Sequence, residues 1–216
     1  MAFIQNVFWV LMAYLIGSIP TGYLVAKRIR GIDIREHGSG NVGATNVFRV
    51  VGKSWGIAVL VIDMFKGWFP TAILASTSNA YPELNLPIKQ FLFAAAAIAG
   101  HTWTPWLKLK GGKGVATSCG ALFGIFPFAT ILTLLVWTSV FLIWRYVSLA
   151  SIIAASSFPL FLLIFYRDLD SFATVFFIGV VLAALLIYNH KSNIERLRRG
   201  QELKIKFGKD KNKSTS

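Results

Sequence analysis

The chain has 216 residues, of which 55% are hydrophobic and 14% are charged, and its formal net charge is +13. So short a chain cannot hide that much apolar sequence in a globular core, which excludes an ordinary water-soluble domain. The positive charge does not indicate nucleic-acid binding, because the basic residues lie in short segments beside apolar runs, where topology and anionic headgroups explain them. The single cysteine, Cys119, excludes an intrachain disulfide.

Apolar runs recur at lengths close to the roughly 20 residues that a helix needs to cross about 30 Å of hydrocarbon. They do not alternate apolar and polar residues as the strands of a membrane barrel do, so we predict an all-α polytopic membrane protein. The seven expected transmembrane helices are Phe3–Ala26, Gly56–Ala75, Ile88–Leu107, Val115–Phe128, Ala129–Trp144, Leu149–Tyr166 and Phe172–Tyr188.

The number of crossings depends on Val115–Trp144, which is either one long tilted helix or two helices divided at Pro127. Six crossings would put the basic tail after Lys191 outside, against the positive-inside tendency. Seven crossings, with the N-terminus outside and the C-terminus cytoplasmic, leave only Lys89 and Arg167 facing outward. We therefore predict seven.

No internal repeat or linker divides the chain, so we expect residues 1–208 to form a single transmembrane domain. Residues 209–216 are polar and are expected to be disordered. The first apolar run is followed, not preceded, by positive charges, which argues against a cleavable signal. Asp63 and Lys66 lie three residues apart inside the second run, and we interpret them as a structural, intramembrane ion pair that holds helices together.

Three polar segments interrupt the apolar runs, and with seven crossings all three emerge on the same face. The first is a glycine-rich turn followed by a helix from about Val42, which Ser39 or Asn41 would cap. A helix N-terminus favours an anion, and Arg49, one turn from Thr45, adds a bidentate donor. The alternative is an interfacial helix whose polar face is merely solvated.

The second polar segment, Lys108–Gly114, places three lysines and three glycines directly before a membrane helix. Exposed amides at a helix start, together with a lysine charge, are typical of a phosphate cradle. The segment is not a Walker A loop, because Lys113 is followed by glycine. A short basic loop is also common in membrane proteins.

The third polar segment continues the last apolar run into the cytoplasm, with His190 and Asn193 on one helical face turned toward the protein. His190 is compatible with a base, a phosphate donor or an interfacial histidine. Neither His37 nor His101 offers metal-ligand spacing, so no metal is expected.

Together these segments resemble the bacterial integral-membrane acyl-phosphate:glycerol-3-phosphate acyltransferases, the PlsY-type family. The resemblance runs from about Leu15 to Ile205. It rests on Gly38–Asn46 with Arg49, Lys110–Thr117, Asp63 with Lys66 and Gly67, Arg145–Ser151, and His190 with Asn193, Ile194, Arg196, Leu197 and Glu202.

This resemblance implies transfer of a fatty acyl group from acyl phosphate to the 1-hydroxyl of sn-glycerol 3-phosphate in phospholipid biosynthesis. The products would be 1-acylglycerol 3-phosphate (lysophosphatidate) and inorganic phosphate. It further implies a site on the cytoplasmic face of the bacterial plasma membrane and no cofactor. The expected surroundings are membrane lipid, and we expect the enzyme to be able to function as a monomer. The alternative is a small membrane transporter of an organic phosphate, which would carry polar residues through its spans.

The resemblance also implies roles for individual residues. Catalytic roles are expected of Ser39, Arg49, Lys113, His190 and Asn193. Substrate or phosphate binding is expected of Gly38, Gly40, Asn41, Gly43, Thr45, Asn46, Gly111, Gly112, Gly114, Thr117, Ser148 and Ser151. Structural roles are expected of Asp63, Lys66 and Glu202. Because acyl phosphate is already activated, we predict direct attack by the glycerol hydroxyl, with the proton going either to His190 or to a substrate phosphate oxygen.

Overall fold

The computed structural model describes residues 2–205, and that part of the chain is helical with no strand. Its α-helices are α1 (Ala2–Ser18), α2 (Thr21–Arg30), α3 (Ala44–Val50), α4 (Lys53–Trp68), α5 (Ala75–Thr77), α6 (Leu86–Thr102), α7 (Val115–Ile125), α8 (Pro127–Trp144), α9 (Val147–Phe165), α10 (Phe172–Tyr188) and α11 (Lys191–Arg198). Turns of 3₁₀-helix occur at Ile34–Glu36 and Pro105–Leu107, and a π-helical turn at Phe69–Leu74. The all-α prediction is confirmed, whereas the expected disordered tail lies outside the described residues.

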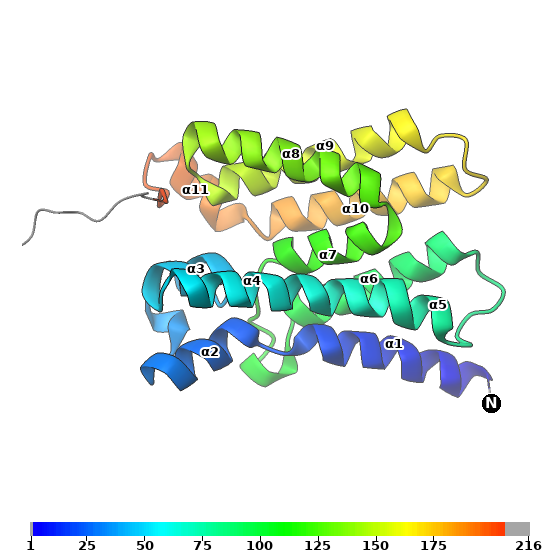
Figure 1. The fold of residues 1–216 in the computed structure, drawn as a ribbon, viewed down its shortest axis with the longest axis horizontal. Helices are drawn as coiled ribbons and strands as arrows, with labels where there is room; N and C mark the ends of the chain where they lie inside the picture. The colour runs from blue at the N-terminus through cyan, green and yellow to red at the C-terminus, as the bar shows by residue number, and fades with distance from the viewer. Residues whose placement is uncertain (1, 206–216) are drawn as a thin grey trace, which may run out of the picture.

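The long helices lie side by side, with their axes along one common direction (Figure 1). α1 packs on α6, α4 on α7, α8 on α9, and α9 on α10. The helices α2, α3 and α11 lie together at one end of the bundle, and α5 and the N-terminus lie at the other end. The first and third polar segments, which adjoin α3 and α11, therefore share one end of the molecule.

Four helical stretches are long and apolar enough to cross a membrane, and α10 with α11, bent by 57°, makes a fifth. The four are Phe3–Arg30, Lys53–Thr77, Pro127–Trp144 and Val147–Phe165. Many large apolar side chains on these helices face outward, among them Phe3 at 78% exposed and Ile143 at 66%. Such a surface requires a hydrocarbon environment, so the protein is a multi-pass membrane protein.

The first apolar run is not the single helix expected over Phe3–Ala26, because the chain breaks between α1 and α2. Pro20 has no amide hydrogen to continue the ladder, and Thr21 N–H donates instead to the Ile19 carbonyl at 2.9 Å. The Ile19 carbonyl oxygen also accepts from Lys66 Nζ at 2.8 Å. A proline break therefore exposes a backbone acceptor inside the bundle, and a buried lysine satisfies it.

The predicted division at Pro127 is confirmed: α7 ends at Ile125 and Pro127 occupies the first position of α8. α7 has 11 residues, about 16 Å of helix, which is too short to cross the hydrocarbon alone. It begins near the middle of the bundle (Figure 1). The run expected over Ile88–Leu107 ends earlier, at Thr102, because the chain turns ahead of Pro105.

Candidate active site

The first polar segment folds around the side chain of Asn46, which is 1% exposed. Its amide group donates to the carbonyls of His37 and Asn41, both at 2.9 Å, and its oxygen accepts from the Ser39 amide at 2.9 Å. Gly38 has φ of 62°, in the left-handed region that glycine adopts without strain. The amide of Asn46 is thus occupied in shaping the turn that presents Ser39.

The helix after this turn begins later and is capped differently than expected. α3 starts at Ala44 with Gly43 as its N-cap, and no side chain caps it. The Asn41 side chain accepts from the Gly43 amide at 2.9 Å instead. The prediction that Ser39 or Asn41 caps this helix is therefore wrong, because the turn uses Asn41 and the backbone of Ser39 for its own hydrogen bonds.

Arg49 connects α3 to the segment after α11, which lies 154 residues away in the sequence. Its guanidinium donates to the Leu203 carbonyl oxygen at 2.9 Å. Arg49 Nε is buried and has no hydrogen-bond partner among residues 2–205. Glu202 and Arg196 both act on the Arg49 charge. The structure therefore offers an unused donor on a fixed cation, a feature suited to an anionic substrate.

The loop Lys108–Gly114 folds back on the end of α6. The Gly111 amide donates to the Thr102 carbonyl at 2.9 Å, and the Gly112 amide donates to the His101 carbonyl at 3.0 Å. These two amides are not the exposed phosphate donors that the sequence pattern suggested. Gly114, with φ of 82°, then starts α7. The amides still available at this helix start are those of its first turn, which have no intrahelical acceptor.

Lys113 leaves this loop toward α11, where its ammonium donates to the Asn193 side-chain oxygen. The Asn193 amide in turn donates to Glu202 Oε1 at 2.7 Å. Ser148 Oγ donates to the same oxygen at 2.8 Å, and Arg196 Nε donates to Glu202 Oε2 at 2.8 Å. A single carboxylate, 5% exposed at its side chain, thus ties together the loop before α7, the start of α9 and α11.

More than one cation surrounds the single carboxylate of Glu202, so the site carries a net positive charge. Burial is the main cause that lowers the pKa of Lys113 to about 8, and the positive charge of Arg196 adds to the effect. Arg49 also disfavours the charged lysine, whereas Glu202 favours it. Three cations and one carboxylate therefore leave a net positive site that an added anion would stabilise.

His190 lies at the bend between α10 and α11, where it is 3% exposed. Its Nδ1 is 2.8 Å from the Leu186 carbonyl oxygen, so Nδ1 carries the proton and Nε2 of the neutral ring is an acceptor. Burial is the main cause that lowers the pKa of His190 to about 4. The last apolar run does not continue straight into the cytoplasm as expected, since the chain bends by 57° here.

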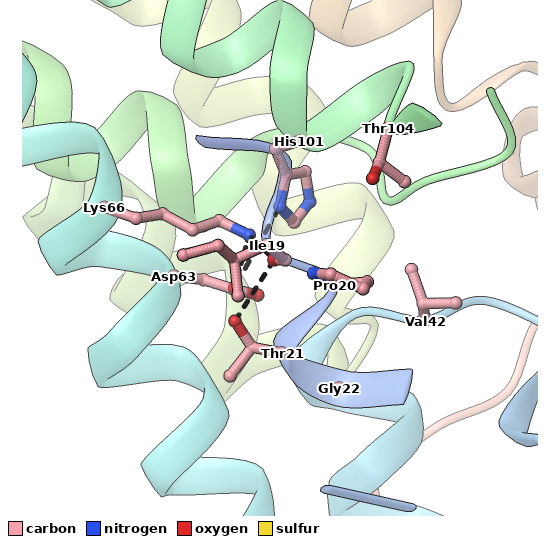
Figure 2. Close-up of a pocket in the computed structure, with 9 residues that line it drawn as sticks. All are labelled: Ile19, Pro20, Thr21, Gly22, Val42, Asp63, Lys66, His101 and Thr104. Atoms are coloured by element: carbon pink, nitrogen blue, oxygen red, sulfur yellow. Dashed lines mark hydrogen bonds and ion pairs between the residues drawn. The ribbon is translucent and has the colours of Figure 1, made fainter. Parts of the chain in front are cut away.

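The predicted ion pair of Asp63 with Lys66 is present, and a histidine ring lies beside it. Lys66 Nζ is 2.9 Å from Asp63 Oδ1, and both side chains are 5% exposed or less. Figure 2 shows the His101 ring directed at the same point from α6, with Nδ1 4.0 Å from Asp63 Oδ1. Sequence reasoning assigned His101 no role. His101 lies 38 positions after Asp63 in the sequence, so no local spacing pattern could have predicted that the two residues meet.

The structure brings four of the five expected catalytic residues, Arg49, Lys113, His190 and Asn193, into contact or within charge range of Glu202. The Ser39 amide instead donates to Asn46, which lies on α3 one turn before Arg49. Ser151 is engaged elsewhere: its hydroxyl donates to the Val147 carbonyl and accepts from Trp137. Thr117 is fully buried, and its hydroxyl lacks a partner in the described part of the chain.

Sequence reasoning also missed Arg196 as a member of the site. Its signal was its spacing three residues after Asn193, on the same helical face. Gly40, Gly43 and Thr45 lie at or near the surface of the first segment. Among residues 2–205, no group of three or more His, Cys, Asp or Glu side chains is placed to hold a metal ion.

A family model described as glycerol-3-phosphate acyltransferase matches residues 7–200 of this chain. The chain belongs to that family. The glycerol-3-phosphate acyltransferase of Desulforudis audaxviator (strain MP104C) is 46% identical over 198 residues, which cover 92% of this chain and 94% of the relative.

Two solved structures show the same fold. A crystal structure of PlsY (YgiH), an integral membrane glycerol 3-phosphate acyltransferase, in the glycerol 3-phosphate form has a TM-score of 0.83 at 40% identity, over 93% of this chain and 96% of that one. The lysophosphatidic acid form has a TM-score of 0.80 at 39% identity, over 93% and 95%. The resemblance drawn from the three polar segments is confirmed. As a member of the glycerol-3-phosphate acyltransferase family, the protein is an enzyme and not a transporter.

Proposed function

We propose that this enzyme transfers a fatty acyl group from acyl phosphate to the 1-hydroxyl of sn-glycerol 3-phosphate. The products are 1-acylglycerol 3-phosphate and inorganic phosphate, an early step of phospholipid synthesis. The observation that carries the proposal is the partly buried cluster of Arg49, Lys113, Asn193 and Glu202, whose positive charge exceeds its negative charge. The two solved relatives, described with glycerol 3-phosphate and with lysophosphatidic acid, support the acceptor and the product.

The site must hold two phosphorylated reactants close together against their mutual repulsion. Lys113 and the unused Nε of Arg49 supply fixed positive charge for this purpose. Ser39, on the turn before α3, and the first turn of α7 supply further donors. Positioning in the correct geometry accounts for much of the rate gain, because acyl phosphate already carries a good leaving group.

In the reaction the glycerol hydroxyl oxygen attacks the acyl carbonyl carbon and forms the ester bond. The bond between that carbon and the phosphate oxygen breaks, and phosphate leaves with the electron pair. The hydroxyl proton passes to a phosphate oxygen. His190 is the weaker candidate for this proton, because its pKa of about 4 lies below the second pKa of a phosphate monoester, about 6. The ring's Nε2 instead accepts a hydrogen bond that orients the acceptor hydroxyl.

The proposal places the site on the cytoplasmic face of a bacterial plasma membrane, with seven crossings and the N-terminus outside. An odd number of crossings agrees with the N-terminus and α11 lying at opposite ends of the bundle (Figure 1). Basic residues such as Lys27, Arg28 and Arg30 end α2 at the same end as α11, as the positive-inside tendency requires. The enzyme acts as a monomer without a cofactor.

A phosphate-release assay with the purified protein in detergent tests the proposal. Release is expected only when acyl phosphate and glycerol 3-phosphate are both present, in equal amounts with the lysophosphatidate formed. Acyl-CoA offered in place of acyl phosphate should give no product. Product from acyl-CoA, or phosphate release without glycerol 3-phosphate, would reject the donor or the acceptor, respectively.

A further inference from the structure

The buried cluster of Asp63, Lys66 and His101 lies beside the loop that carries Lys113. It is separate from the charged site, which consists of Arg49, Lys113, Asn193, Arg196 and Glu202. His101 lies in the last turn of α6, and its side chain is 7% exposed. The chain then leaves α6 and returns as the loop Lys108–Gly114. If the cluster served only to join helices, it would have no need to lie next to this loop.

The loop is fitted to the His101 side chain as well as to its backbone. A Cβ atom added to Gly112 would lie 2.1 Å from His101 Nε2 and 2.8 Å from Cε1. Gly112 does not have a positive φ, so its backbone alone does not call for glycine. The imidazole ring occupies the space that any other residue at position 112 would need.

A cavity large enough for one water molecule adjoins both the ring and its carboxylate. Asp63 Oδ1 and His101 Nδ1 are 4.0 Å apart, which is too far for a direct hydrogen bond. Both residues line a cavity of about 10 Å³, together with Thr21 and Thr104 (Figure 2). That volume is about what one water molecule requires, and the lining is polar enough to hold it.

Lys66 fixes the other side of this unit. Its ammonium pairs with Asp63 at 2.9 Å and donates to the Ile19 carbonyl at the proline break. The carboxylate is thereby held at one place in the bundle. With a water between Asp63 and Nδ1, the ring keeps one orientation and turns Nε2 toward Gly112.

We propose that His101 is a positioning residue for the acyl-acceptor site. Asp63 orients its ring through one bound water, and the ring and the His101 carbonyl together hold Gly112, so that Lys113 reaches Asn193. The inference rests on the proposed function, because it assigns the loop to binding of glycerol 3-phosphate. His101 touches neither substrate. It sets the affinity for glycerol 3-phosphate by setting where the loop lies.

A double-mutant experiment tests the contact between ring and glycine. Gly112→Ala should raise the KM for glycerol 3-phosphate by about thirtyfold or more, with a smaller effect on the KM for acyl phosphate. His101→Ala should raise the same KM by about tenfold, with kcat changed by less than about threefold. In the His101→Ala background, adding Gly112→Ala should cost less than about threefold further, because the ring is no longer there.

Gly111→Ala is the matched control. A Cβ at Gly111 would lie 2.0 Å from the His101 carbonyl oxygen, a backbone atom that His101→Ala leaves in place. Its effect should therefore be equally large with and without the ring. Equal costs of Gly112→Ala in both backgrounds would overturn the proposal, as would His101→Ala lowering kcat while leaving the KM for glycerol 3-phosphate unchanged.

A readout independent of catalysis separates this inference from the proposed function. Amide hydrogen exchange over residues 108–114 should become faster in His101→Ala and in Asp63→Asn, while exchange in α8 and α9 stays unchanged. If His101→Ala does not fold, His101→Asn removes the ring but keeps an amide for the bridging water, and the same cycle is run there. Unchanged exchange in the loop would reject the positioning role even if the enzyme used another donor or acceptor.

Discussion

At the residue scale, Lys113 carries a positive charge that its burial and its neighbouring cations disfavour. Its ammonium is largely buried beside Arg196 and Arg49, and only Glu202 nearby is negative. Burial lowers its pKa to about 8, so the charge that attracts a phosphate is present below this pH and is lost as the pH rises through it.

The KM for glycerol 3-phosphate should therefore be constant near neutral pH and rise up to about tenfold per pH unit above about pH 8. The substrate phosphate is already a dianion in that range, so the change reports on the enzyme. Lys113→Ala should have a high KM that no longer varies with pH in this range. Lys53→Ala, which removes an exposed lysine, should retain the wild-type profile. A KM for the wild type that stays flat to pH 10 would contradict the assignment.

Substitution of His190 tests whether the hydroxyl proton passes to this histidine or to a phosphate oxygen. Since burial holds its pKa at about 4, the ring is neutral at the pH of the reaction and is a poor proton acceptor. His190→Ala should lower kcat by about tenfold or less, the loss of one hydrogen bond. Single-turnover kinetics would measure the chemical step directly. A loss of about a thousandfold would make His190 the base.

At the scale of the elements, Glu202 lies in the segment after α11 and joins it to α9 and to the loop before α7. Every group around it donates: a hydroxyl, an amide and a guanidinium. An ionised carboxylate accepts all of them, and these hydrogen bonds hold the pKa of Glu202 below its usual range despite its burial. The three elements are therefore held by an acceptor and not by apolar contact alone.

Glu202→Gln should destabilise the protein by about 1–3 kcal/mol, because an amide nitrogen would face one of these donors. Thermal unfolding in detergent measures the loss. Glu195→Gln on α11 is the control, since the Glu195–Arg199 pair is more than half exposed on both sides, and it should cost less than about 1 kcal/mol. Equal losses in the two variants would show that Glu202 does not organise the site.

The packing of α7 on α4 depends on close backbone approach. A Cβ at Gly120 would lie 1.9 Å from the Met64 carbonyl oxygen, whereas a Cβ at Gly179 would meet only the end of Leu162, at 2.9 Å. Gly120→Ala should therefore lower the free energy of unfolding by about 1–3 kcal/mol. Gly179→Ala should lower it much less, because the end of a leucine side chain can rotate away. Melting temperatures of the two variants in the same detergent decide the matter. A Gly120→Ala variant as stable as the wild type would show that the helices separate freely.

At the scale of the whole molecule, the crossing that contains α7 differs from the others. α7 is too short to cross alone, yet the chain must pass from the loop before it to the far end of the bundle. This is consistent with a loop, Lys108–Gly114, that enters the protein and completes the crossing together with α7.

Thiol labelling in intact cells tests this topology, using single cysteines in a Cys119→Ala background. Asp168→Cys, whose parent side chain is 97% exposed, should react with an impermeant reagent from outside. Lys108→Cys and Lys191→Cys should react only after permeabilisation. If Lys108→Cys and Asp168→Cys react from the same side, α7 is not part of a crossing and the count is even.

The sequence by itself determined the apolar helices, the division at Pro127, the ion pair of Asp63 with Lys66 and the positions of the three polar segments along the chain. Each of these depends on local composition or on spacing along one helix. Only the tertiary structure decided that the Gly111 and Gly112 amides donate to α6, that the Asn46 side chain is buried, and that the His101 ring fills the space beside Gly112. The physical reason is that a hydrogen-bond partner is set by packing between helices far apart in the chain, whereas hydropathy acts on each residue where it stands.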